Sequence, residues 1–179
     1  MKARGAALVG IVVLTSALAG CATMEPPPTL YERLTAADFL PGGAERVAAG
    51  RDALALVVDD FVANMVANPT IKGRFNFKES PKTKALIAKG LPPALAELQV
   101  VSTFKANLAD QLCQATGGPC SYLGRDMKTT HAGMKITDAD WNATVEALVK
   151  ALDRRKVPDA EKKELLGVLG PLKAEIVGQ

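Results

Sequence analysis

The sequence predicts an all-α domain that follows an N-terminal leader. Three observations support this: apolar residues recur at spacings of three and four, strand-like alternation is rare, and aromatic residues make up only 4% of the 179 residues. The formal net charge of +3 argues against a nucleic-acid binder, which usually shows a strong basic excess. One histidine and three cysteines argue against a zinc site built from several such ligands.

The first twenty residues are typical of a secretion signal. Lys2 and Arg4 precede an apolar run over residues 6–19, which is shorter than the roughly 20 residues of a membrane-spanning helix. Residues 18–21 (LAGC) resemble a bacterial lipoprotein box, which implies cleavage before Cys21 and lipidation of that cysteine. By the same resemblance, Ala22 in place of an aspartate implies an outer-membrane anchor that faces the periplasm. An ordinary signal peptide with an incidental cysteine stays open.

The domain boundaries follow from this leader. Residues 1–20 are predicted to be the signal peptide, residues 21–29 a proline-rich tether, and residues 30–179 the folded domain. Acyl chains on Cys21 would hold the mature protein on a membrane. Cys113 and Cys120 would then lie in an oxidising compartment, where a bridge and two buried free thiols are both open readings.

In the first half of the domain, the sequence predicts two helices and leaves the segment between them ambiguous. Residues 30–35 predict a short helix, whereas Pro41-Gly42-Gly43 interrupts residues 36–51. Residues 52–67 predict an amphipathic helix, because their apolar side chains recur at helical spacing. Asn68-Pro69 ends that helix.

The middle of the chain predicts a short helix and a long one. Ser80 followed by Pro81 predicts an N-cap and a helix to about Lys89. The long helix begins at Pro93 and ends before Gly117-Gly118-Pro119. Its apolar stripe includes Leu95, Leu98, Val101, Phe104, Leu108 and Leu112.

The last third predicts three helical segments. Residues 126–132 predict one or two turns. Thr137 with Asp140 is similar to a capping box and predicts a helix over residues 138–154. A final helix begins at Pro158-Asp159 and is kinked at Gly170-Pro171.

His131 is the candidate metal ligand. A single histidine near a loop is most often a surface or core residue, yet one imidazole can bind iron when a porphyrin supplies four further nitrogens. Residues 57–61 (VVDDF), Asn68-Pro69 and Phe75 resemble the second helix and following turn of group 1 truncated hemoglobins. The motifs over residues 111–120 (QLCQATGGPC) and 124–137 (GRDMKTTHAGMKIT) resemble this family more specifically. The resemblance implies a two-over-two helical sandwich with heme b and His131 as proximal ligand.

The same resemblance implies roles for other residues. Phe75 would stack on the porphyrin, and Met127, Ile136 and Trp141 would line its proximal side. Lys128 is either a partner for a heme propionate or a solvated lysine, and both readings are open.

The distal side departs from the family pattern. Its lining would include Phe61, Val62, Phe104 and Leu108. Val62 stands where many members carry a tyrosine, and Leu108 where they often carry a glutamine. Since neither side chain donates a hydrogen bond, we expect fast release of O₂; plain core packing is the alternative role. Residues 35–51 and 76–101 are insertions relative to the family, either a lid or partner surface or inert elaboration.

Two functions are compatible with the sequence. The first is a heme protein that binds O₂, NO or CO at the periplasmic face of a membrane. Nitric oxide dioxygenation would need a reductase partner and bound O₂, which the donor-free pocket disfavours, and peroxidase-like activity stays open. The second is a heme-free helical lipoprotein that acts as an adaptor or envelope component.

Overall fold

The computed structural model describes residues 26–35 and 50–179 of the chain. The predicted signal peptide, Cys21 and most of the ambiguous segment 36–51 lie outside the described residues. The helices are α1 (Leu30–Thr35), α2 (Arg51–Ala67), α3 (Pro81–Ala88), α4 (Pro93–Ala115), α5 (Met127–His131), α6 (Asp138–Arg154), α7 (Asp159–Leu169) and α8 (Lys173–Ile176), with short 3₁₀ turns η2 (Lys72–Arg74) and η3 (Gly170–Leu172). Over these residues there is no strand, only an isolated bridge between Ile136 and Val177. The all-α prediction is confirmed.

Local capping signals set several helix ends. The Ser80 hydroxyl accepts a hydrogen bond from the backbone N–H of Thr83 at the start of α3. Thr137 and Asp140 form the reciprocal capping box predicted for α6. The kink predicted at Gly170-Pro171 is present as η3, which separates α7 from α8.

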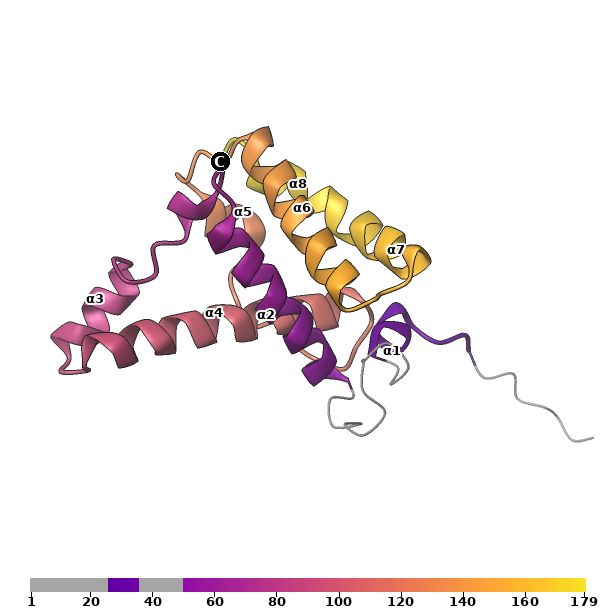
Figure 1. Cartoon of the computed structure of the whole chain (residues 1–179), viewed down its shortest axis with the longest axis horizontal. Coiled ribbons are helices and arrows are strands. Elements are labelled where there is room, and N and C mark those ends of the chain that lie inside the picture. Colours follow the sequence, from indigo (N-terminus) through magenta and orange to yellow (C-terminus); the bar gives the residue numbers. More distant parts are fainter. Residues whose placement is uncertain (1–25, 36–49) are drawn as a thin grey trace, which may run out of the picture.

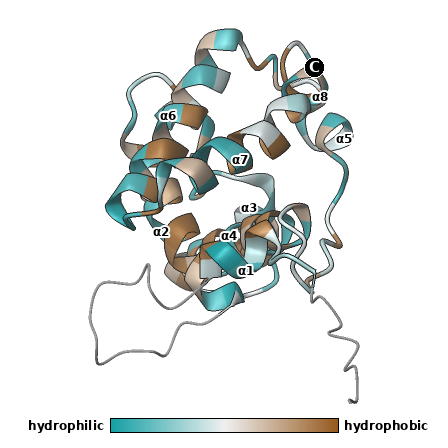
Figure 2. Ribbon diagram, turned by 90° about the vertical axis from the view of Figure 1, so that its right-hand side faces the viewer, coloured by the Kyte–Doolittle hydropathy of each residue, from teal (hydrophilic) through white to brown (hydrophobic). Residues whose placement is uncertain are grey.

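Helix α2 is the centre of the core. It packs against both α4 and α6, and Figure 1 shows α4 crossing the lower half of α2 while α6, α7 and α8 lie to its upper right. Val58 is fully buried at the middle of α2, and Leu152 and Leu165 bring α6 and α7 into the same cluster. Figure 2 shows hydrophobic residues along α2 and α6, both of which contribute to this cluster.

The short helix α1 is attached to the end of α4. The backbone N–H of Tyr31 donates to the carbonyl of Thr116 at 2.8 Å. A β-carbon at Gly118 would lie 2.5 Å from the Tyr31 ring and 2.7 Å from Cys113 Sγ, so no side chain fits there. Cys113 and Cys120 form a disulfide beside this contact, with their Cα atoms 5.7 Å apart. Of the two open readings of these cysteines, the structure therefore has the bridge.

Much of the second insertion is helical. Residues 76–101 contain α3 and the first turns of α4, and α3 packs on α4. Thr83 is fully buried there and its hydroxyl donates to the Phe77 carbonyl at 2.6 Å. Among the helices over residues 26–35 and 50–179, none is both long and apolar enough to cross a membrane.

Candidate functional site

His131 ends the short helix α5, whose start is fixed by Asp126. The Asp126 carboxylate accepts a hydrogen bond of 2.8 Å from the backbone N–H of Thr129. This bond holds the pKa of the Asp126 carboxyl below its ordinary value. The Asp126 cap therefore fixes where α5 begins, and His131 lies in the last turn of this helix.

The His131 ring is oriented by its own helix. Its Nδ1 lies 2.7 Å from the carbonyl oxygen of Met127. Because a carbonyl oxygen only accepts, this contact requires the hydrogen on Nδ1. In the neutral ring Nε2 then carries the free lone pair, and it makes no hydrogen bond to any described residue. The Nε2 lone pair is therefore the one available to a metal ion.

Aromatic side chains gather where the segment after α2 meets α4. Phe75, which follows η2, lies 6.1 Å from Phe104 of α4, measured between ring centroids. Phe77 lies 5.4 Å from Phe104 and 6.2 Å from Phe75. All three are half-buried. The structure thus brings together the predicted residues Phe75 and Phe104, and adds Phe77, whose apolar character two positions after Phe75 was the available signal.

A polar side chain connects α4 to α5. The amide Nε2 of Gln111 donates to Sδ of the buried Met127 at 3.2 Å. Gln111 lies three positions after Leu108 and therefore shares its helix face. Sequence reasoning quoted Gln111 only as part of a motif and gave it no role.

The remaining predicted site residues divide by burial. Phe61 and Val62 are buried in the core on α2, whereas Leu108 on α4 is half-buried. Ile136 and Trp141 are half-buried on the segment after α5 and on α6. The Lys128 side chain is exposed. Leu108, Ile136 and Trp141 thus each keep part of an apolar side chain uncovered by the protein.

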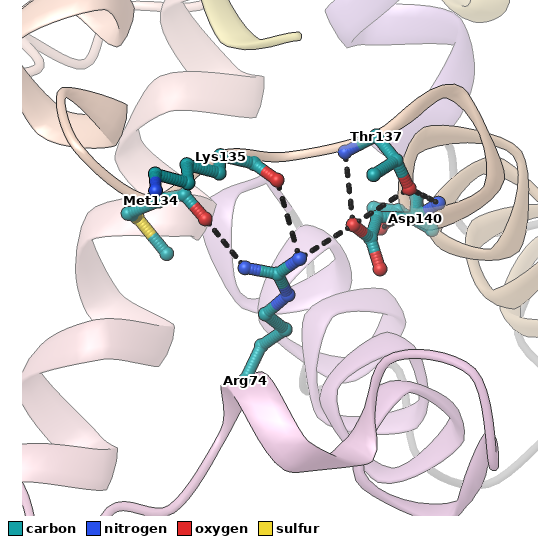
Figure 3. A network of polar contacts seen from close by, with 6 residues as sticks. Arg74, Met134, Lys135, Thr137 and Asp140 are labelled. Atoms are coloured by element: carbon teal, nitrogen blue, oxygen red, sulfur yellow. Dashed lines mark hydrogen bonds and ion pairs between the residues drawn. The ribbon is translucent and has the colours of Figure 1, made fainter. Parts of the chain in front are cut away.

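Arg74 forms a polar network that the sequence did not indicate (Figure 3). Its guanidinium donates to the carbonyls of Met134 at 2.5 Å and Lys135 at 3.3 Å, and to the Asp140 carboxylate at 2.8 Å. The backbone N–H of Thr137 is the main group that holds the pKa of the Asp140 carboxyl below its ordinary value, with help from the Thr137 hydroxyl and Arg74. This network ties η2 to the loop that follows His131.

The sequence is similar to a known protein family and to one characterised relative. Residues 94–177 match the family described as "Bacterial-like globin". Group 1 truncated hemoglobin GlbN of Mycolicibacterium paratuberculosis is 29% identical over 127 residues, which cover 71% of this chain and 78% of that relative.

Solved truncated hemoglobins share the fold. The Fe(III) form from Tetrahymena pyriformis superposes with a TM-score of 0.60 at 22% identity, covering 85% of this chain and all of that one. The 2/2 hemoglobin of Synechococcus, solved in the cyanomet state with covalently attached heme, gives a TM-score of 0.60 at 19% identity with the same coverage. Residues 94–177 are therefore similar to the bacterial-like globins, and most of the chain has the truncated-hemoglobin fold.

Proposed function

We propose that the protein binds heme b through His131 and that the heme binds a diatomic gas, O₂, NO or CO. The observation that carries this proposal is the His131–Met127 contact, which occupies Nδ1 and leaves the Nε2 lone pair free for a metal. The name of the mycobacterial relative, a truncated hemoglobin, supports the same reading. When bound, heme would supply four porphyrin nitrogens and an open coordination position for the gas.

The residues opposite His131 would make the pocket dry. Val62 and Leu108 carry no hydrogen-bond donor, and Phe104 is apolar. The Thr103 hydroxyl is exposed and already donates to the Gln99 carbonyl at 2.8 Å. The Gln111 amide is engaged with Met127. The chain would therefore hold bound gas mainly by shape and apolar contact.

The proposal includes export and lipid anchoring at Cys21. The lipoprotein-like signal is the sequence argument, and the Cys113–Cys120 disulfide is an independent one, because disulfides persist in oxidising compartments such as the periplasm. Pro26, Pro27 and Pro28 are exposed and stand before α1, as a spacer between anchor and domain would. The domain would thus work at the periplasmic face of the outer membrane.

Heme reconstitution of the purified domain tests the central proposal. We expect the wild-type protein to show a Soret band, and His131→Gly to lose it. Added imidazole should restore the band in His131→Gly, because free imidazole can occupy the space of the missing side chain and bind the metal. Thr129→Ser is the matched control on the same helix, since it keeps the hydroxyl that contacts the Asp126 carboxylate together with the backbone N–H; it should keep the band.

Two results would contradict heme binding through His131. A colourless, folded wild-type protein would support the heme-free lipoprotein instead. If the spectrum of His131→Gly without imidazole is the same as that of the wild type, a residue other than His131 is the metal ligand.

Lipid labelling in cells tests the anchor. We expect a radiolabelled fatty acid to be incorporated into the wild type and into Thr23→Ser, a neighbouring change that keeps the cysteine. Cys21→Ala should incorporate none and leave the membrane fraction. Equal labelling of Cys21→Ala would refute lipidation at this residue.

A further inference from the structure

Arg74 connects two segments that carry residues proposed to contact the heme. It ends η2 directly before Phe75, and its guanidinium reaches the loop directly after His131. Figure 3 shows the side chain pointing between the Met134 and Lys135 carbonyls and the Asp140 carboxylate. One side chain thus connects the residue next to Phe75 with the residues that follow His131.

The loop after His131 is also fixed from its other side. The backbone N–H of Lys135 donates to the Gln179 carbonyl at 2.8 Å, and that of Gly178 donates to the Ile136 carbonyl at 2.9 Å. Lys135 has a φ of 50°, a left-handed conformation that a non-glycine residue adopts only when its surroundings require it. The C-terminal residues and Arg74 therefore hold this loop between them.

The loop is in turn bonded to the histidine. The backbone N–H of Met134 donates to the His131 carbonyl at 3.0 Å. Met134 is therefore hydrogen-bonded both to Arg74, through its carbonyl, and to His131. Movement of the Met134 carbonyl would move the end of α5. The position of the imidazole thus depends on this loop.

An arginine suits this place because its guanidinium is planar and presents donors in a fixed fork. Two carbonyls and one carboxylate accept from it, and Asp140 is held in turn by the Thr137 backbone and hydroxyl. A lysine would keep the charge, but its donors all lie on one nitrogen and lack the planar fork.

We propose that Arg74 is a positioning residue that sets the distance and tilt of His131 relative to the heme. This inference rests on the proposed heme binding. Arg74 acts through the loop over residues 132–137 and not by contact with the heme. The fixed loop limits the motion of the imidazole and so slows the loss of heme.

The test compares Arg74→Gln with a matched control, Arg33→Gln. The two arginine side chains are 32% and 31% exposed. Arg33 also pairs with carboxylates, those of Glu161 and Glu164, and donates to a backbone carbonyl, but it joins α1 to α7. A general loss of stability should therefore appear in both variants, whereas an effect on His131 should appear only in Arg74→Gln.

Three quantities are measured. Heme transfer to an excess of a scavenging apoprotein should be about tenfold faster in Arg74→Gln, a factor equivalent to about 1.4 kcal/mol. The iron–histidine stretching band of the ferrous protein should shift or broaden. Hydrogen exchange of the apoprotein over residues 132–137 should speed up. Arg74→Lys, which keeps the charge, should lie between wild type and Arg74→Gln, and Arg33→Gln should match wild type in all three.

The outcomes separate this inference from the proposed function. A wild-type protein without heme would overturn both. If wild type binds heme through His131 while Arg74→Gln leaves the stretching band and the heme-loss rate unchanged, the positioning role is wrong and heme binding stands. Equal changes of the measured quantities in Arg74→Gln and Arg33→Gln would mean that Arg74 only stabilises the fold.

Discussion

Asp60 of α2 and Arg155, the residue after α6, form a partly buried ion pair across the core. Nε of Arg155 donates to the Asp60 carboxylate at 2.6 Å, and the two side chains are 22% and 10% exposed. Arg154 places a second guanidinium 3.5 Å from the other carboxylate oxygen. The pair fixes the end of α6 on the middle of α2, the two helices that form the central contact of the fold.

Removal of the Asp60 charge should destabilise the domain. Asp60→Asn should lower the free energy of unfolding by about 1.5–3 kcal/mol, the usual contribution of a hydrogen bond to a charged group. Urea unfolding measures this. The neighbouring Asp59 is the control, because its carboxylate is 53% exposed and pairs with Lys105. Asp59→Asn should cost less than about 1 kcal/mol, and equal losses in the two variants would contradict the burial argument.

The Cys113–Cys120 disulfide should contribute to stability despite its short loop. For seven residues of separation, chain entropy predicts about 2.5 kcal/mol. In a domain of this size that corresponds to a Tm lower by roughly 5–10 °C in Cys113→Ala/Cys120→Ala. Thermal unfolding with and without a thiol reductant tests this. Reductant should lower the Tm of the wild type and leave that of the double variant unchanged; a fall in both would show that the effect is not due to this bridge.

Local signals account for most of the predicted helices. Ser80-Pro81 and the Thr137–Asp140 box each lie within four residues, so their chemistry can be recognised without knowledge of the fold. The structure begins α3 and α6 where these signals place them. Thr29 and Glu32 exchange capping hydrogen bonds at the start of α1 in the same way, over a separation of three residues.

The contacts that shape the candidate site are of another kind. Arg74 and Asp140 are 66 positions apart, and Gln111 and Met127 are 16 apart on different helices. No periodicity or cap relates such pairs, because the packing of whole helices brings them together. Family resemblance selected His131, but the resemblance had no counterpart for Arg74.

Acid should weaken the Arg74–Asp140 network. Hydrogen bonds from Thr137 and the charge of Arg74 lower the pKa of Asp140 in the folded state, so its stabilising effect is present above the unfolded pKa of about 3.9. That effect is lost as the pH falls through the folded pKa, where the carboxyl becomes protonated. Asp140→Asn should therefore be less stable than wild type by about 2 kcal/mol at pH 7, and the difference should shrink below pH 4.

Chemical unfolding of both proteins across this pH range gives the measurement. The difference between the two curves isolates Asp140 from the other carboxyl groups that titrate in the same range. A difference that stays constant down to pH 2 would mean that the charge of Asp140 does not matter.

A donor placed on α4 should slow O₂ release. Leu108 is half-buried on the helix that carries Phe104, and its side chain offers no hydrogen bond. Iron-bound O₂ carries partial negative charge, and a hydrogen bond to a charged acceptor contributes about 1.5–3 kcal/mol. Leu108→Gln should therefore lower the O₂ dissociation rate by about tenfold to a hundredfold.

Stopped-flow measurement of O₂ and CO release separates this electrostatic effect from a steric one. Leu108→Met is the control, because it changes the shape of the side chain without adding a donor. We expect CO, which carries less charge, to respond little to either variant, and O₂ to respond to Leu108→Gln alone. Slow O₂ release from the wild type itself would contradict a donor-poor pocket. Gln111 would then be the first side chain to replace, because its amide lies three positions further along the same helix face.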